Sequence, residues 1–155
     1  MKIISCSRNE TLAIAKSLAK NISSADIIGL FGELGSGKTV FVKGFASGLG
    51  IQAEQIISPT FVLIRQYRGR LGLFHFDLYR LDSPDDIAKL GYEEYLYGEG
   101  VSIIEWAQRL GCFLPKEMLK IKIKILGKNK RCLEFLPGNK HYERLIKKTY
   151  ENTGY

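Results

Sequence analysis

The chain has 155 residues, the size of one domain, and its 45% hydrophobic and 25% charged residues are typical of a folded protein with a real core. No apolar run approaches the roughly 18–20 residues that a membrane-spanning helix needs, and charged and polar residues interrupt positions 1–20, where a signal peptide would be apolar. We therefore expect a single domain over residues 1–155 that stays in the cytoplasm and has no membrane contact.

The net charge of +7 is unevenly distributed along the chain. Residues 1–110 carry 12 Lys and Arg against 12 Asp and Glu, whereas residues 111–155 carry 11 against 4. Such an excess can mark a surface for RNA or for an acidic protein. Lysines on the solvent side of strands and helices give the same pattern, so direct contact with RNA stays open at this stage.

The cysteines show neither a disulfide nor a metal-binding pattern. The three cysteines, Cys6, Cys112 and Cys132, are odd in number and widely spaced. That pattern fits neither a disulfide framework nor a zinc site. We interpret them as reduced structural residues.

The first elements predicted along the chain are a helix, a strand and a second helix. Residues 9–21 place apolar side chains at helical spacing. Residues 25–32 form a short, nearly all-apolar run that ends in glycine, as expected for a buried strand of a parallel sheet. Residues 38–49 again have the apolar spacing of a helix.

The second half of the chain predicts two hairpins around a further strand. Residues 60–67 and 71–77 are expected to pair around a turn at Arg68-Gly69-Arg70. A short helix starts at Ser83-Pro84, and residues 101–106 predict another buried strand. Residues 119–126 alternate strictly and turn back into 131–136, which predicts a hairpin with one lysine-rich face, and the tail 142–150 is weakly helical.

The segment between the first strand and the second helix carries a chemical motif. Gly32-Glu33-Leu34-Gly35-Ser36-Gly37-Lys38-Thr39 matches the P-loop pattern G-x-x-x-x-G-K-[ST] without a gap. Glycines let successive backbone N–H groups point at phosphate oxygens, and the following helix adds its positive end. Lys38 can then reach the β- and γ-phosphates, and the Thr39 hydroxyl can coordinate Mg²⁺. We therefore predict an α/β fold of the P-loop NTPase type, with a mostly parallel central sheet, flanking helices and antiparallel hairpin strands.

Two acids at strand ends are candidates for the metal and water chemistry. Asp77 follows the strand 71–76, and Glu105 follows the strand 101–104. Either resembles the acid that completes a P-loop metal site, although an acid at a strand end can also cap a turn. His75 is interpreted as a hydrogen-bonded packing residue rather than a base.

Other P-loop classes are tested by their own motifs. The D-x-x-G motif of small GTPases is not formed at Asp77, which is followed by Leu78-Tyr79-Arg80, and N-K-x-D is not formed at Asn129-Lys130, which is followed by Arg131-Cys132. A small-molecule kinase needs an arginine-rich lid, and 62–80 contains four arginines but is predicted to form strands. The kinase stays open as the alternative, as does a nucleotide-binding adaptor without useful catalysis.

Five motifs in order carry a resemblance to a known family. They are GELGSGKT at 32–39, SPTF at 58–61, HFDLYR at 75–80, LGYEEYL at 90–96 and IEW at 104–106. Together they resemble the TsaE (YjeE) family of small bacterial P-loop ATPases over roughly residues 25–110. The last three motifs are much more specific than the P-loop.

The resemblance implies a role in making threonylcarbamoyladenosine (t6A), a modified base beside the anticodon of tRNA. It implies an ATPase with ATP and Mg²⁺ that acts on the TsaD–TsaB transferase pair and reaches tRNA indirectly. It also implies site residues. Lys38, Asp77 and Glu105 would be catalytic, and Thr39 and Glu105 would bind the metal. The implied nucleotide contacts are Gly32, Glu33, Leu34, Gly35, Ser36, Gly37, Lys38, Thr39, Val40 and Trp106. Thr60 resembles a switch threonine, or is an ordinary strand residue.

Overall fold

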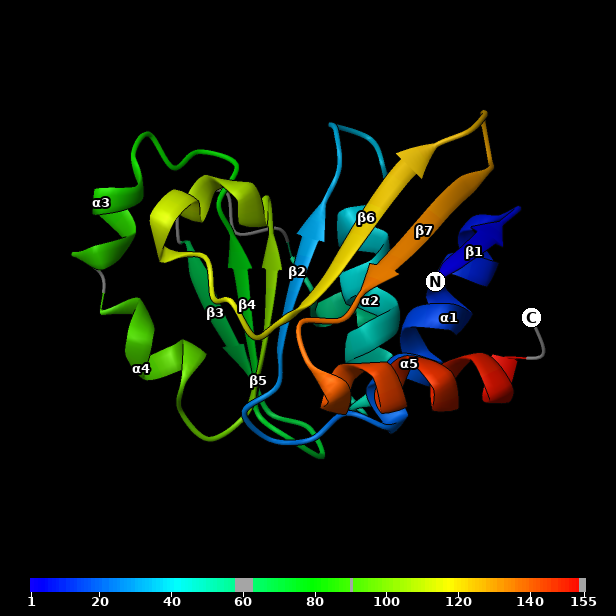
Figure 1. Ribbon diagram of the computed structural model, residues 1–155, viewed down its shortest axis with the longest axis horizontal. Coiled ribbons are helices and arrows are strands. Elements are labelled where there is room, and N and C mark those ends of the chain that lie inside the picture. Colours follow the sequence, from blue (N-terminus) through cyan, green and yellow to red (C-terminus); the bar gives the residue numbers. More distant parts are fainter. Residues whose placement is uncertain (58–62, 90, 154–155) are drawn as a thin grey trace.

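A mixed β-sheet forms the centre of the protein. The computed structural model describes residues 1–57, 63–89 and 91–153. Within these residues seven strands form one sheet in the order β1-β7-β6-β2-β5-β4-β3 (Figure 1). The elements are β1 Lys2–Ser5, α1 Arg8–Lys20, β2 Ile27–Phe31, α2 Lys38–Gly48, η1 Ala53–Gln55, β3 Ile64–Tyr67, β4 Leu73–Asp77, α3 Pro84–Ala88, α4 Tyr92–Leu96, β5 Val101–Glu105, η2 Ala107–Phe113, β6 Leu119–Ile125, β7 Arg131–Leu136 and α5 Lys140–Thr153.

The four middle strands are parallel, and both edges of the sheet are antiparallel. β2 pairs in parallel with β6 and β5, and β5 with β4, whereas β3, β7 and β1 join through antiparallel pairs. The predicted parallel centre with hairpin strands is therefore confirmed. Because parallel strands end at the same edge of a sheet, the carboxyl ends of β2, β5 and β4 meet beside the glycine loop (Figure 1).

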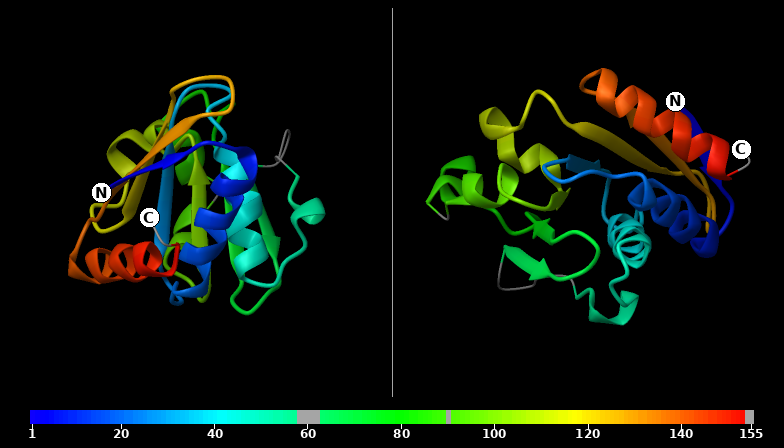
Figure 2. Two further views of the ribbon diagram at one scale, coloured as in Figure 1. Left: turned by 90° about the vertical axis from the view of Figure 1, so that its right-hand side faces the viewer. Right: turned by 90° about the horizontal axis from the view of Figure 1, so that it is seen from below.

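Helices cover both faces of the sheet. α1 and α2 pack side by side on one face, η2 lies over the other, and α5 crosses near the ends of the strands and contacts α1 (Figure 2). The approach of α1 to α2 depends on Gly44, where a Cβ atom would lie 2.4 Å from the Leu12 carbonyl oxygen. Phe41 and Phe45 of α2 are fully buried in the core beneath. This packing fixes the start of α2, and with it the end of the glycine loop.

Most predicted elements are present, and three differ. The segment 83–96 forms two short helices, which are separated at Gly91 with a φ of 62°. The tail is a full helix of 14 residues, α5, rather than a weak one. β1 and η2 were not predicted. The expected strand 60–67 is seen from Ile64, and Thr60 lies outside the described residues.

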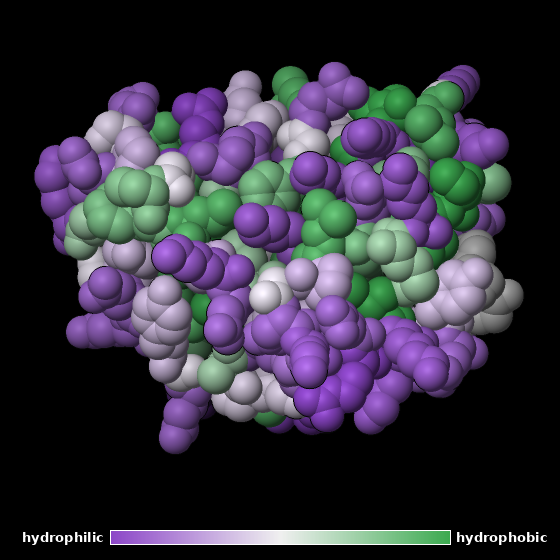
Figure 3. All heavy atoms as spheres, viewed as in Figure 1, coloured by the Kyte–Doolittle hydropathy of each residue, from purple (hydrophilic) through white to green (hydrophobic). Residues whose placement is uncertain are grey.

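The lysine-rich face of the second hairpin is exposed as expected. Leu119, Ile121 and Ile123 are buried, whereas Lys122 and Lys124 face solvent. Figure 3 shows hydrophilic side chains gathered over α5 and mixed with hydrophobic ones over β6 and β7. All three cysteines are free thiols, but only Cys132 is buried, so the predicted structural role is wrong for the exposed Cys6 and Cys112. In the described part of the chain, no helix has the length and apolar character to cross a bilayer.

Candidate functional site

The glycine loop between β2 and α2 is open on the side where phosphate would lie. Gly35 and Gly37 have φ angles of 76° and 104°, a left-handed conformation that only glycine adopts without strain. A Cβ atom built on either glycine would meet nothing within 4 Å. Gly37 is also the N-cap of α2, and no side chain caps this helix. The loop and the first N–H groups of α2 thus form a concave anion site of the kind that backbone N–H groups build.

The Lys38 side chain is folded back against the loop. Its amine donates hydrogen bonds to the carbonyl oxygens of Gly32 at 2.8 Å and Glu33 at 2.9 Å. It also lies 3.7 Å from the centroid of the Trp106 ring, a cation–π contact. Burial lowers the pKa of Lys38 below its usual value, although the nearby Glu105 and Asp77 carboxylates act in the opposite direction. The hydrogen bonds that the amine donates therefore go only to neutral oxygen atoms in the described residues.

Glu105 lies next to Thr39, as a shared metal site requires. The Thr39 hydroxyl donates a hydrogen bond of 2.9 Å to Oε2 of Glu105. The other carboxylate oxygen, Oε1, lies 2.9 Å from Nε2 of the buried His75. Register explains the meeting: Leu30, near the end of β2, pairs with Glu105 at the end of β5. A helix start and a strand end that are 66 positions apart in the sequence thus meet at one edge of the sheet.

Asp77 is the second acid at this edge. It pairs in register with Glu105 across β4 and β5 and is 8% exposed. The backbone N–H of Tyr79 donates a hydrogen bond of 3.1 Å to its Oδ1. Both acids line a cleft of about 360 Å³ that also contains Lys38 and Thr39. The two candidate acids therefore face the same space.

Trp106 forms a wall of that cleft. It has a φ of 58°, which is unusual for a residue other than glycine, at the turn between β5 and η2. Its ring packs against Tyr79 with a centroid distance of 5.0 Å. The left-handed turn reverses the chain directly after Glu105, and it places the ring over the Lys38 amine. The predicted position of Trp106 beside the glycine loop agrees with this arrangement.

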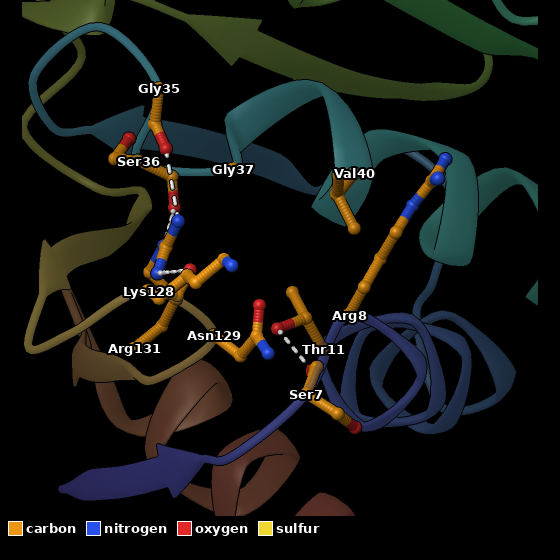
Figure 4. A pocket seen from close by; sticks show the side chains of 10 residues that line it. All are labelled: Ser7, Arg8, Thr11, Gly35, Ser36, Gly37, Val40, Lys128, Asn129 and Arg131. Carbon is orange, nitrogen blue, oxygen red and sulfur yellow. Dashed lines mark hydrogen bonds between the residues drawn. The ribbon is translucent and has the colours of Figure 1, made fainter.

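A second pocket, of about 190 Å³, lies on the other side of the loop. Figure 4 shows Lys128, Asn129 and Arg131 from the β6–β7 hairpin facing Ser7 and Thr11 from the start of α1 across this pocket. The full lining is Ser7, Arg8, Thr11, Gly35, Ser36, Gly37, Val40, Lys128, Asn129 and Arg131. The two pockets share Gly35, Gly37 and Val40, so a ligand seated along the loop can extend from one to the other.

Arg131 holds the loop from the hairpin side. Its Nε donates to the Ser36 carbonyl oxygen at 2.9 Å, and its Nη2 donates to that of Gly35 at 3.2 Å. Its remaining nitrogen, Nη1, binds carbonyl oxygens of the 127–130 turn. The rigid, planar guanidinium therefore ties the β6–β7 turn to the glycine loop.

The structure brings together nearly all of the predicted site residues. Leu34, Lys38, Thr39, Val40, Asp77, Glu105 and Trp106 line the cleft, together with Gly35 and Gly37. Gly32 and Glu33 take part through their carbonyl oxygens, and the Ser36 hydroxyl lies 3.4 Å from the Lys38 amine. Thr60 cannot be placed, because it lies outside the described residues.

Sequence reasoning missed the residues of the second pocket. One local signal was present, because Ser7 and Glu10 have the spacing of a capping box. The structure contains one half of that box, in which the Glu10 N–H donates to the Ser7 hydroxyl at 3.1 Å, whereas the Glu10 carboxylate accepts from the N–H of Cys6, one residue before the cap. It marks the start of α1, but it carries no information that this helix start lies opposite the hairpin turn.

The donor set suits a magnesium ion that is shared with phosphate. Among the described residues no cluster of three or more His, Cys, Asp or Glu side chains could hold a metal by itself. Thr39 and Glu105 supply one hydroxyl and one carboxylate, both oxygen ligands, at the mouth of the open loop. Mg²⁺ typically binds through one or two protein oxygens, phosphate oxygens and water, so these residues fit it.

The parallel strands, the glycine loop and the acids at neighbouring strand ends define an α/β protein with a P-loop NTPase-like fold. Comparison with known proteins gives the family. The family model described as "Threonylcarbamoyl adenosine biosynthesis protein TsaE" matches residues 5–133. The chain therefore belongs to the TsaE family.

Individual relatives agree with this family. The tRNA threonylcarbamoyladenosine biosynthesis protein TsaE of Bacillus subtilis is 44% identical over 137 residues, which cover 88% of this chain and 85% of that protein. The protein of the same name from Treponema pallidum is 41% identical over 84% of this chain and 96% of its own. A crystal structure of Bacillus subtilis YdiB matches with a TM-score of 0.81 and 38% identity, and the match covers 98% of this chain and 95% of that one.

Proposed function

We propose that this protein binds ATP with Mg²⁺ on the glycine loop and hydrolyses it, and that it does so in the biosynthesis of t6A in tRNA. The observation that carries the proposal is the convergence of Lys38, Thr39, Asp77 and Glu105 on one cleft beside an open loop of left-handed glycines. The names of the Bacillus and Treponema relatives support the pathway. The family resemblance adds the TsaD–TsaB pair as partner, through which tRNA is reached.

Phosphate would be held by the loop and by Lys38. The N–H groups at the start of α2 have no side-chain cap and are available to phosphate oxygens. To reach a phosphate, the Lys38 amine exchanges the carbonyl oxygens of Gly32 and Glu33 for a charged oxygen. A phosphate oxygen carries negative charge, whereas the two carbonyl oxygens are neutral dipoles, so the positively charged amine favours the exchange.

The acids have separate tasks in this mechanism. Thr39 and Glu105 would hold Mg²⁺, which when bound neutralises charge that develops on the phosphates. Asp77 lies in register beside Glu105 and faces the same cleft, where it can accept a hydrogen bond from the attacking water and orient it. Trp106 covers one side of the cleft and reduces its exposure to bulk water.

The nucleoside would occupy the second pocket. The phosphates lie along the loop, and Gly35, Gly37 and Val40 line both pockets, so the nucleoside can leave the loop toward Ser7 and Thr11. Asn129 is a neutral polar group suited to a sugar or a base, whereas the buried Thr11 hydroxyl is already hydrogen-bonded to Ser5. This assignment leaves the cleft with Asp77 and Glu105 for the reacting end of the molecule.

A small-molecule kinase is less well supported by this geometry. Of the four arginines between residues 62 and 80, Arg70 is committed to the end of α1, where it donates to the Ala19 carbonyl oxygen at 2.9 Å. Arg65, Arg68 and Arg80 are exposed and line neither of the two pockets beside the loop. The arginine-rich lid that would favour a kinase is therefore not assembled in the described part of the chain.

Phosphate release from Mg²⁺–ATP tests the proposal. The purified protein is assayed alone and with the TsaB and TsaD proteins of the same organism. We expect slow release alone and a clear rise with the pair, because the family resemblance implies partner-dependent turnover. Lys38→Ala should abolish nucleotide binding or turnover, whereas Lys43→Ala on the same helix, outside both pockets, should match the wild type. Full activity of Lys38→Ala, or transfer of labelled phosphate to a small molecule, contradicts the proposal.

A further inference from the structure

His75 stands in the middle of β4, one strand away from Glu105. It pairs with Ile103 of β5, and Glu105 follows two residues later on the same face of that strand. The His75 side chain is completely buried, and its Nε2 atom lies 2.9 Å from Oε1 of Glu105. His75 does not line the cleft beside the glycine loop. His75 therefore contacts the carboxylate from the protein interior and not from the cleft.

The Glu105 carboxylate is bound at both of its oxygens. Thr39 donates to Oε2 from the cleft side, and His75 lies against Oε1 from the interior, each at 2.9 Å. Two contacts on opposite oxygens fix the plane of a carboxylate, whereas one contact leaves it free to rotate. The contact with Thr39 is between two residues that would both bind the metal. Only the contact with His75 is made from the protein interior.

The second ring nitrogen indicates which way the hydrogen bond runs. Nδ1 of His75 is buried and has no hydrogen-bond partner among the described residues. A neutral ring with its proton on Nε2 donates to Glu105 and leaves only a bare acceptor unpaired. The other tautomer would turn a lone pair toward the carboxylate and bury an unpaired N–H group, which costs more. The surroundings thus select the tautomer in which His75 is the donor.

We propose that His75 is a positioning residue, which holds the Glu105 carboxylate in the orientation that lets it bind the magnesium ion together with Thr39. The inference rests on the proposed function, because it concerns the same metal site. It goes beyond the sequence-based interpretation of His75 as a packing residue. Groups that hydrogen-bond to a metal ligand from the far side typically change metal affinity or activity by about 10–100-fold when they are replaced.

The test compares substitutions that keep or remove the donor. His75→Gln carries an amide N–H far enough along its side chain to reach Glu105, whereas His75→Leu fills a similar volume with no donor. Phe76→Leu is the matched control, because Phe76 is equally buried on the same strand but, one position along, points to the opposite face of the sheet from His75 and Glu105. Melting temperatures show that each variant folds.

The main measurement is metal binding without turnover. Mn²⁺ is titrated into each protein saturated with a non-hydrolysable ATP analogue, and free Mn²⁺ is read by electron paramagnetic resonance. ATP binding without metal is measured by calorimetry, and kcat is measured with Mg²⁺. We expect His75→Leu to weaken Mn²⁺ binding and lower kcat by about 10–100-fold, while ATP affinity without metal changes less than about twofold. His75→Gln should recover most of the metal affinity, and Phe76→Leu should keep it.

Two results overturn the inference. One is wild-type metal affinity in folded His75→Leu. The other is an equal loss in the Leu, Gln and Phe76 variants, which would mean that packing alone is responsible. If His75→Leu does not fold, His75→Asn replaces it, because the Asn side chain is too short for its amide to reach Glu105. The metal affinities of His75→Asn and His75→Gln are then compared to decide the same question. If the wild-type protein binds neither ATP nor Mn²⁺, the proposed function itself fails, and this outcome is distinct from the other two.

Discussion

The amine of Lys38 lies 3.7 Å from the centroid of the Trp106 ring, so the residue that would bind phosphate and the residue that walls the cleft are in direct contact. Lys38 also donates to two carbonyl oxygens of the glycine loop. All of these partners are weaker than a phosphate oxygen. Nucleotide binding should therefore change the fluorescence of Trp106, because it draws the charged amine away from the ring.

Trp106 fluorescence should report this movement. Trp106 is the single tryptophan of the chain, so all tryptophan emission comes from the site. We expect Mg²⁺–ATP to change the emission saturably as the amine leaves the ring, and a titration monitored near the emission maximum measures it. Lys38→Met should begin with altered emission and respond little. An unchanged wild-type signal at ATP concentrations where calorimetry shows binding would contradict the predicted exchange.

Glu105→Ala should separate nucleotide binding from turnover. The hydrogen bonds found for the carboxylate among the described residues run to Thr39 and His75, so we expect the loop to keep its phosphate contacts when the carboxylate is removed. We expect kcat to fall by about 10²-fold or more and the Mg²⁺ requirement to rise, while ATP affinity without metal stays within about threefold. Phosphate release against Mg²⁺ concentration measures the effect. Glu99→Ala, an exposed acid outside both pockets, is the control.

Arg131→Ala should loosen the glycine loop and weaken ATP binding while the fold persists. Its guanidinium holds the Gly35 and Ser36 carbonyl oxygens, so its removal leaves the loop free to sample other conformations. We expect a loss of roughly 5–30-fold in ATP affinity, which corresponds to about 1–2 kcal/mol. Calorimetry measures it, with the exposed neighbour Lys130→Ala as control. Equal affinity in both variants would show that the loop is held without Arg131.

The strand, glycine loop and helix at 27–48 could be predicted because every signal for them is local. The apolar run, the glycines and the helical spacing stand next to one another in the sequence. That Asp77 and Glu105 lie side by side could not be predicted in this way. It depends on β4 pairing in parallel with β5 at one particular register, and no local pattern specifies that register.

The elements that were missed are those that depend on tertiary contacts. β1 has four residues, too few for an alternating pattern to stand out, and it exists because it pairs with β7. α5 is rich in polar residues, and it is a full helix because Tyr142, Leu145, Ile146 and Thr149 are buried. The second pocket joins Ser7 to Arg131 through the positions of α1 and β7 in the fold. The sequence contained these residues, but only the topology brings them together.

ATP affinity should fall in alkaline solution because of Lys38. Burial lowers its pKa below the usual value of 10.5, and a bound phosphate raises it again by stabilising the charged amine. Between these two pKa values binding takes up a proton, so affinity decreases as the pH rises through the lowered pKa. Calorimetric titration without metal from about pH 8, where phosphates are fully ionised, upward measures the decrease. Lys38→Arg should flatten it, because a guanidinium stays charged. A wild-type affinity independent of pH would contradict the prediction.

The buried hydroxyl of Tyr142 predicts a separate alkaline effect on folding. Burial raises its pKa from 10.0 to about 12, and the hydroxyl accepts a hydrogen bond of 2.9 Å from the Ile27 N–H, which ties α5 to the start of β2. Because the folded-state pKa is the higher one, this stability is fully present below pH 10 and is lost as the pH rises toward about 12. A shift of this size corresponds to roughly 2–3 kcal/mol.

Tyr142→Phe should therefore lose its disadvantage in stability as the pH rises. Near pH 8 the variant should be less stable by about 1–3 kcal/mol, because the buried Ile27 N–H loses its acceptor. Above pH 10 the wild type must ionise a buried hydroxyl and the variant need not, so the difference in the free energy of unfolding should shrink and approach zero. Urea unfolding at a series of pH values measures both proteins. Tyr150→Phe, on the exposed side of the same helix, should keep the wild-type dependence. A gap for Tyr142→Phe that stays constant from pH 8 to pH 11.5 would mean that the hydroxyl does not ionise with the fold intact, and that its contribution is the hydrogen bond alone.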